Sequence, residues 1–220
     1  MHVVHGDVGW VEVICGPMFS GKSEELIRRL KRAAIARQRL QIFKPAIDDR
    51  YHEARIVSHS EHWLEAVPVR GSAALARAVL PETRVVGVDE VQFFDAGVVD
   101  VIERLADRGV RVIVAGLDQD YAAQPFEPVP RILALAEYVT KALAICARCG
   151  APAGRSQRIV TSTERVVVGA TDAYEPRCRR CHTPRAEGRT AAAMRTAPSR
   201  SPSTATPSRE PASEKRIASP

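Results

Sequence analysis

Residues 10–38 place a strand-like run, a glycine-containing loop and an amphipathic helix one after another. The run WVEVIC at 10–15 is mostly apolar, and SEELIRRLKRAAIARQ at 23–38 repeats its apolar residues at helical spacing. Between them, residues 16–23 read GPMFSGKS, which matches the phosphate-loop pattern of glycine, four residues, then Gly-Lys-Ser. This order predicts a strand, loop and helix whose backbone N–H groups form a concave site for a polyphosphate.

Each residue type in this loop suits polyphosphate binding. Lys22 is expected to reach the outer phosphates, and Ser23 to ligate Mg²⁺. The alternative is an ordinary glycine turn before a helix. Cys15, just before the loop, is expected to be a small core residue rather than a nucleophile. The residues expected to bind ATP are Gly16, Pro17, Met18, Phe19, Ser20, Gly21, Lys22 and Ser23.

The same alternation of strands and helices continues along the chain. Further strands are expected at 40–44, 84–90, 110–116 and 140–146, and a helix at 97–109. Strands that alternate with helices predict an α/β fold of the P-loop NTPase type, with a parallel sheet flanked by helices. Ligands of such sheets bind at the carboxyl ends of the strands.

The acids Asp89 and Glu90 come directly after the apolar run 85–88. At the end of a strand, Asp89 is placed as a Walker B carboxylate that holds the Mg²⁺ shell. Adjacent side chains of a straight strand point in opposite directions, so Glu90 is expected to be aimed elsewhere. A free carboxylate near the γ-phosphate is suited to take a proton from an attacking oxygen. The alternative is a surface pair of acids at a strand end.

Four of the five cysteines form two Cys-x-x-Cys pairs separated by 28 residues. Such spacing suits two knuckles that share one tetrahedral metal ion, and zinc is the expected metal. With four thiolates the coordination is full, so the predicted zinc site is structural. The expected ligands are Cys146, Cys149, Cys178 and Cys181. His182 could replace Cys181, but the regular spacing favours the cysteine. A pair of disulfides is the alternative.

Composition divides the chain into three parts. We expect a P-loop kinase domain at 1–140, a small zinc-binding domain at 141–184 and a disordered tail at 185–220. The tail is built from Ala, Ser, Thr, Pro and Arg, which offer little to bury against a core.

The charge and hydropathy of the chain disfavour nucleic acid and membranes as partners. The formal net charge is +6, but most of it falls in the tail, so nucleic acid is not an expected partner. No apolar stretch approaches the ~18 residues of a membrane span. The N-terminus lacks the features of a signal peptide, so a cytoplasmic protein without membrane contact is expected.

Sequence features narrow the class of nucleotide-dependent protein. The chain has no Asn-Lys-x-Asp element, which disfavours a GTPase, and it is short for a helicase. A small-molecule kinase fits better. A zinc-ribbon ATPase that binds nucleic acid is the alternative, although aromatic residues for base stacking are scarce near the knuckles.

Several motifs together carry a family resemblance. GPMFSGKS, DEVQFF, LDQDYAAQPF, the two cysteine pairs and VVVGATDAYEPRC occur in this order. At these intervals they resemble the zinc-containing P-loop thymidine kinases of the cytosolic type. The resemblance covers about residues 9–182. It implies transfer of the γ-phosphoryl group of ATP to the 5′-hydroxyl of thymidine, giving thymidine monophosphate for DNA precursor salvage.

The resemblance also implies roles for individual residues. Glu90 matches the family's general base. Further ATP and Mg²⁺ contacts are implied for Asp48, Asp49, Arg50, Asp89, Glu90, Val91 and Gln92. A lasso-like loop, here about residues 117–135, is implied to read the base together with the strand before the last knuckle. Tyr121 stands where the family commonly has phenylalanine. The implied thymidine contacts are Met18, Phe93, Tyr121, Arg165, Val166, Val167, Val168, Gly169 and Tyr174.

Two further properties are implied only by the resemblance. They are feedback inhibition by thymidine triphosphate and a homotetrameric assembly.

Overall fold

A parallel six-stranded sheet forms the centre of the fold. The computed structural model describes residues 8–46, 55–57, 63–161 and 173–183. The strands lie in the order β5 (Val67–Val69), β2 (Leu40–Pro45), β6 (Val85–Val88), β7 (Arg111–Gly116), β1 (Trp10–Cys15) and β8 (Tyr138–Lys141). All five neighbouring pairs run parallel. The α/β fold and the parallel sheet expected from the sequence are confirmed.

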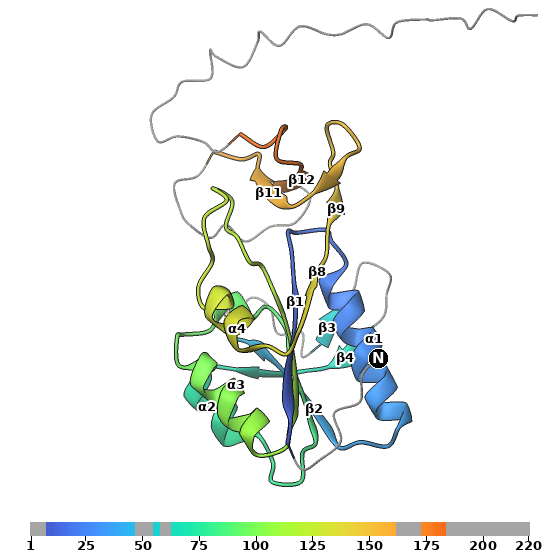
Figure 1. Cartoon of the computed structure of the whole chain (residues 1–220), viewed down its shortest axis with the longest axis vertical. Helices are drawn as coiled ribbons and strands as arrows, with labels where there is room; N and C mark the ends of the chain where they lie inside the picture. Colours follow the sequence, from blue (N-terminus) through green and yellow to red (C-terminus); the bar gives the residue numbers. More distant parts are fainter. Residues whose placement is uncertain (1–7, 47–54, 58–62, 162–172, 184–220) are drawn as a thin grey trace, which may run out of the picture. The chain divides into compact units, whose positions relative to one another are not determined.

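Helices cover both faces of this sheet (Figure 1). They are α1 (Lys22–Ile35), α2 (Ser72–Ala78), α3 (Val98–Asp107) and α4 (Val129–Leu135). Side chains of β7 alternate between the faces, as strand geometry requires. Val112 and Val114 join the core under α2, α3 and α4, whereas Ile113 and Ala115 join the core under α1. The near-continuous apolar sequence of β7 follows from this burial on both faces.

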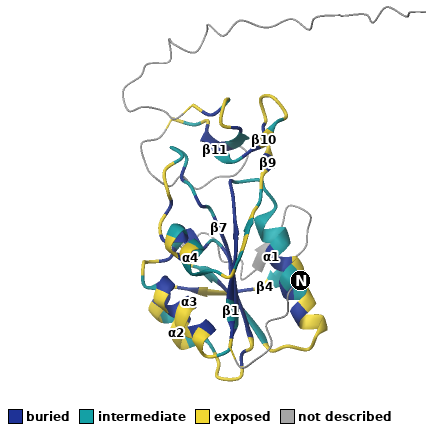
Figure 2. Cartoon of the chain, viewed as in Figure 1, coloured by how far each residue is buried: buried dark blue, intermediate teal, exposed yellow. Residues whose placement is uncertain are grey.

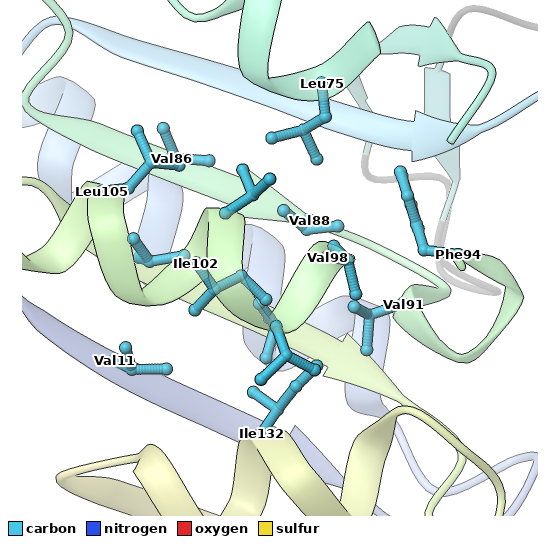
Figure 3. Close-up of a cluster of buried hydrophobic side chains, with 14 of the residues drawn as sticks. Val11, Leu75, Val86, Val88, Val91, Phe94, Val98, Ile102, Leu105 and Ile132 are labelled. Atoms are coloured by element: carbon cyan, nitrogen blue, oxygen red, sulfur yellow. The ribbon is translucent and has the colours of Figure 1, made fainter. Parts of the chain in front are cut away.

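The larger core lies between the sheet and helices α2 and α3 (Figure 3). Leu75 of α2 and Ile102 of α3 are fully buried in it, together with Val86 and Val88 of β6. Burying each such side chain contributes about 1.5–3 kcal/mol. Figure 2 shows the same division, with a buried central strand β1 and exposed outer faces on α2 and α3. This core fixes the end of β6, where the acidic pair lies.

A buried ion-pair network attaches α1 to the other face. Glu12 of β1 lies 2.8 Å from Arg29 of α1 and 2.6 Å from Arg111 of β7. Arg29 also donates to the hydroxyl of Thr140 in β8, at 2.8 Å. Burial opposes ionisation of Glu12, but hydrogen bonds from Arg111 and Trp10 and the charges of Arg111 and Arg29 outweigh it and lower its pKa. The network therefore joins three strands to the helix that follows the glycine loop.

The expected strand at 140–146 is wrong as a single element. The structure has β8, ending at Lys141, and a separate strand β9 (Ala144–Ile145). Ala142 and Leu143 between them belong to neither strand, and Ala142 N donates to Cys15 O at 2.8 Å. This break lies beside the start of the glycine loop, which apolar periodicity alone does not reveal.

The segment after β7 is only partly irregular. Prolines lie at 125, 128 and 130, yet α4 begins at Val129 and has Pro130 in its first turn. Proline is tolerated in a first helical turn, because N–H groups at that position have no partner within the helix. The irregular part is therefore the loop 117–128.

Short strands follow the sheet. β9 pairs antiparallel with β10 (Pro152–Ala153), and β11 (Arg155–Arg158) pairs antiparallel with β12 (Tyr174–Arg177). A further pair, β3 (Arg55–Val57) and β4 (Trp63–Glu65), lies outside the central sheet.

All the described residues fall within one compact unit. The expected boundary near residue 140 stays a prediction, and the expected tail lies outside the described residues. No helix in the described part of the chain is long and apolar enough to cross a membrane.

Candidate active site

The glycine loop joins β1 to α1 with a backbone that side chains would disfavour. Gly16 and Gly21 have φ angles of 142° and 77°, and Phe19 between them also has a positive φ of 64°. A Cβ atom on Gly16 would lie 2.2 Å from Ala142 O. Gly21 is the N-cap of α1 and provides no side-chain cap. The first turn of the helix is thus left to an external acceptor, which suits a phosphate.

Lys22 turns back onto this loop. Its Nζ donates to Pro17 O at 2.7 Å, and Ser20 Oγ donates to the same carbonyl at 2.8 Å. Burial lowers the pKa of Lys22, and the nearby carboxylates, Glu90 foremost, oppose that shift. The ammonium group therefore lies in the field of the acids that follow β6.

Asp89 faces the beginning of α1. Ser23 Oγ donates to Asp89 Oδ2 at 3.1 Å, and the Glu90 backbone N–H donates to Oδ1 at 3.0 Å. Burial, reinforced by the charge of Glu90, raises the pKa of Asp89 to about 7. A buried carboxylate and a hydroxyl side by side form an oxygen-rich site suited to Mg²⁺.

Glu90 leaves the strand direction. Its φ of 50° starts a 3₁₀ turn, η1 (Val91–Phe93), so it does not continue the alternation of β6. Gln92 Nε2 donates to Glu90 Oε2, and Gln92 Oε1 accepts from Leu117 N at 3.0 Å. Val91, expected near ATP, places its side chain in the core under α3 and α4. The structure therefore brings Glu90, Asp89 and Gln92 together and turns the Val91 side chain away.

Aromatic rings lie beside this edge of the sheet. Phe93 of η1 packs edge-on against Phe126 of the loop 117–128, with ring centroids 6.0 Å apart. Met18 N donates to Ser156 Oγ of β11 at 2.9 Å, so the glycine loop also touches the β11–β12 pair. Phe126 lies in the motif LDQDYAAQPF of the implied lasso-like loop, although it was not among the expected thymidine contacts. Nothing local in the sequence marked Ser156.

Tyr121 and Tyr174 meet a common partner, Arg158 of β11. The Arg158 guanidinium carbon lies 3.7 Å from the centroid of the Tyr121 ring, and Nη2 donates to Tyr174 Oη at 2.9 Å. Both tyrosines were expected to contact the nucleoside. Arg158 was not expected to take part, because an arginine in a short strand gives no local signal of burial.

A second carboxylate follows β7. Asp118 is buried, and its Oδ2 lies 2.6 Å from Lys141 Nζ at the end of β8. Its charge also acts on Lys22. This ion pair fixes the first residues of the loop 117–128 against the strand beside the glycine loop.

The four cysteines of the two Cys-x-x-Cys pairs converge. Ligand atoms of Cys146, Cys149, Cys178 and Cys181 all lie within 4.8 Å of one another. Burial opposes ionisation of Cys146, but backbone hydrogen bonds from Cys178, Arg148 and Cys149 outweigh it and lower its pKa to about 6. Four sulfur atoms gathered in this way fit a tetrahedral metal, since the thiolate is the ligand form. His182 is turned away from them, because its Nε2 lies 2.9 Å from Tyr121 O.

Some expected site residues lie outside the described part of the chain. They are Asp48, Asp49, Arg50, Arg165, Val166, Val167, Val168 and Gly169.

These features define a class: an α/β protein in which a glycine loop suited to polyphosphate meets two carboxylates at the carboxyl edge of a parallel sheet. The sequence model of the family described as "Thymidine kinase" matches residues 9–182. A thymidine kinase of Rhodothermus sp. (strain ITI 518) is 60% identical over 179 residues, which cover 81% of this chain and 84% of that protein. The chain belongs to the thymidine kinase family. It is therefore a kinase, and the resemblance drawn from the motifs is confirmed.

Proposed function

We propose that this enzyme transfers the γ-phosphoryl group of ATP to the 5′-hydroxyl of thymidine and releases thymidine monophosphate and ADP. Family membership supports the substrate. The observation that carries the chemistry is the meeting of the glycine loop with the acids after β6, where Ser23 hydrogen-bonds to Asp89. The loop proposed to bind ATP and the proposed base Glu90 thereby lie at the same carboxyl edge of the sheet.

The reaction is a single in-line displacement. Glu90 takes the proton of the 5′-hydroxyl while that oxygen bonds to the γ-phosphorus and the bond to the leaving oxygen of ADP breaks. Lys22 neutralises charge on the outer phosphates. Ser23 and Asp89 would hold Mg²⁺, which supplies further neutralisation of the phosphate charge. Gln92 orients Glu90 through its amide.

The nucleoside binds between aromatic side chains. Phe93 and Phe126 form one wall beside η1, and Tyr121 and Tyr174 lie near Arg158. Met18, at the edge of the glycine loop, completes the slot. A flat pyrimidine gains most from such apolar and aromatic faces, while backbone groups read its polar edge.

The four cysteines hold a structural Zn²⁺. The convergence of their sulfur atoms supports this assignment, because closed four-sulfur sites stabilise folds and leave no position for a reacting water. A zinc ion here would tie β9 to the turn that follows β12.

Product analysis tests the function directly. ADP release is measured with ATP and Mg²⁺ in the presence of thymidine, in its absence, and with single-stranded DNA in its place, and thymidine monophosphate is quantified by chromatography. ADP and monophosphate should appear together, and only with thymidine. ADP release driven by single-stranded DNA, without monophosphate, would refute the kinase assignment.

Finer properties of the enzyme follow from the resemblance. Thymidine triphosphate should inhibit the enzyme, which an inhibition curve at fixed ATP would show. A homotetramer is supported by exposed apolar side chains on the edge strand β8 and just after it, since Val139, Leu143 and Ile145 are 51%, 52% and 69% exposed. Light scattering would give the assembly. We place the enzyme in the cytoplasm, where thiols remain reduced and free to bind zinc.

A further inference from the structure

The tip of the loop 117–128 is a tight turn that is held together by its own hydrogen bonds. Asp120 Oδ1 accepts hydrogen bonds from the backbone N–H groups of Ala122 and Gln124, at 2.9 and 3.0 Å. The backbone of Asp120 also pairs with Gln124 O, at 2.9 Å. Tyr121 lies within this turn, so the position of the turn also determines the position of the Tyr121 ring.

His182 holds the backbone of this turn from the last cysteine knuckle. Its Nε2 lies 2.9 Å from Tyr121 O, and its side chain is buried. A carbonyl oxygen only accepts hydrogen bonds, so Nε2 is the donor. The backbone of His182 belongs to the knuckle, since its N–H donates to Cys178 O at 2.9 Å.

The residue after His182 is fixed to the neighbouring strand. Thr183 N donates to Gln157 Oε1 of β11 at 2.8 Å. The backbone N–H groups of His182 and of the next residue are therefore both hydrogen-bonded, which fixes the chain from which the imidazole projects. Arg158, the next residue of β11, covers the Tyr121 ring. The turn is thus clamped at its carbonyl by His182 and at its ring by Arg158.

The other end of the same loop reaches the catalytic edge. Phe126 packs against Phe93, which lies three residues after Glu90 in the chain. Within the described residues, the hydrogen bonds of His182 go to the loop turn and to the knuckle rather than to the glycine loop. A change at His182 should therefore alter the slot for the nucleoside without altering the site for ATP.

We propose that His182 is a positioning residue for the nucleoside, which holds the Tyr121 turn in the shape that thymidine binds. The inference rests on the proposed function and adds to it a residue that acts through another. Loss of the imidazole donor would leave the Tyr121 carbonyl without this partner and free the turn to shift.

The test compares H182F and H182Q with the wild-type enzyme, all loaded with zinc. Phenylalanine keeps the size of the ring and removes the donor, whereas glutamine keeps a donor. H182F should raise KM for thymidine about tenfold, with KM for ATP and kcat changed less than twofold. H182Q should restore most of the loss. R179Q, an exposed change in the same knuckle, is the matched control and should match wild type.

Two more measurements separate a positioning role from a purely structural one. Zinc content should be the same in all variants, and hydrogen exchange at residues 120–124 should be faster in H182F than in wild type. An equal loss for ATP and thymidine, a loss of zinc, or unchanged thymidine KM would overturn the proposal.

Two remaining outcomes are also decisive. If neither H182F nor H182Q folds, His182 is a folding residue and the proposal fails. If wild-type enzyme neither binds thymidine nor phosphorylates it, the proposed function fails instead.

Discussion

Gln92 links Glu90 to the backbone of Leu117. Its amide donates to the Glu90 carboxylate and accepts from Leu117 N at 3.0 Å, so a single side chain joins η1 to the start of the loop 117–128. Gln92 is only 3% exposed, which leaves its amide little freedom to exchange these partners for water. The carboxylate proposed as general base is therefore oriented by the loop that also carries Tyr121.

Removing the Glu90 carboxylate should remove most of the turnover. Glu90→Gln keeps the shape of the side chain but cannot take a proton, so kcat should fall by about 10²–10⁴. Binding of ATP and thymidine, measured by calorimetry, should change little. Near-normal turnover in this variant would mean that another group accepts the proton. Glu103→Gln, on helix α3, serves as the matched control and should keep full activity.

Asp89 gives the ligand-free enzyme a pH-dependent stability. Its pKa is raised from 3.8 to about 7, so between these values the folded chain holds a proton that the unfolded chain has released. Stability from this group is therefore lost as pH rises towards 7. Asp89→Asn removes the effect, and its stability relative to wild type should increase by on the order of 1 kcal/mol per pH unit.

Urea unfolding at pH 5.5, 6.5 and 8, with a chelator present, measures this difference. The gap between Asp89→Asn and wild type should widen up to about pH 7 and then stay constant. A gap that does not vary with pH would contradict the assignment. Added Mg²⁺ and ATP should stabilise wild type far more than the variant.

Gly16 is the residue of the glycine loop least able to accept a side chain. In Gly16→Ala the new Cβ would lie 2.2 Å from Ala142 O, at a φ of 142° that alanine rarely adopts. The glycine loop or the segment after β8 must then move, at a cost of about 1–3 kcal/mol from the backbone alone. ATP binding should weaken strongly, as measured by calorimetry.

Gly154→Ala is the control for this prediction. A Cβ there would have its nearest neighbour at 3.7 Å, an ordinary contact, and no positive φ is involved. It should leave ATP binding unchanged. Equal behaviour of the two variants would show that the shape of the glycine loop does not govern ATP affinity.

The cysteine cluster should control thymidine binding more than ATP binding. Cys146→Ser should lose most of the bound zinc and loosen the knuckle that precedes His182, so KM for thymidine should rise before ATP binding is affected. Metal analysis and separate titrations of the two substrates measure this order. Cys15→Ala, in the core and outside the cluster, should keep its zinc. A metal-free Cys146→Ser enzyme with unaltered thymidine kinetics would contradict the prediction.

The elements that the sequence predicted well are those whose pattern is local. β1, α1, α3 and β7 each have a clear apolar period, and the structure has them within a few residues of the expected ranges. The stretch between β2 and β6 gave no such signal. There β5 spans three residues and α2 seven, too short for a period to develop.

The site was predictable where chemistry is concentrated in a motif. The glycine loop, the acids after β6 and the cysteine pairs each combine special residue types with fixed spacing. Arg158 and His182 could not be found in this way, since their roles depend on contacts with Tyr121 across 37 and 61 positions of sequence. Only the folded chain shows that the histidine after the last cysteine turns towards the loop.

The contact between Met18 and Ser156 can couple the binding of ATP to the binding of thymidine. The hydrogen bond from Met18 N to Ser156 Oγ joins the turn that faces triphosphate to the strand that carries Arg158. If bound ATP takes over the Met18 N–H, strand β11 loses this hydrogen bond. The position of Arg158 beside the thymidine site would then change. Thermodynamic linkage requires the influence to run equally in both directions, so each substrate would report on the occupancy of the other.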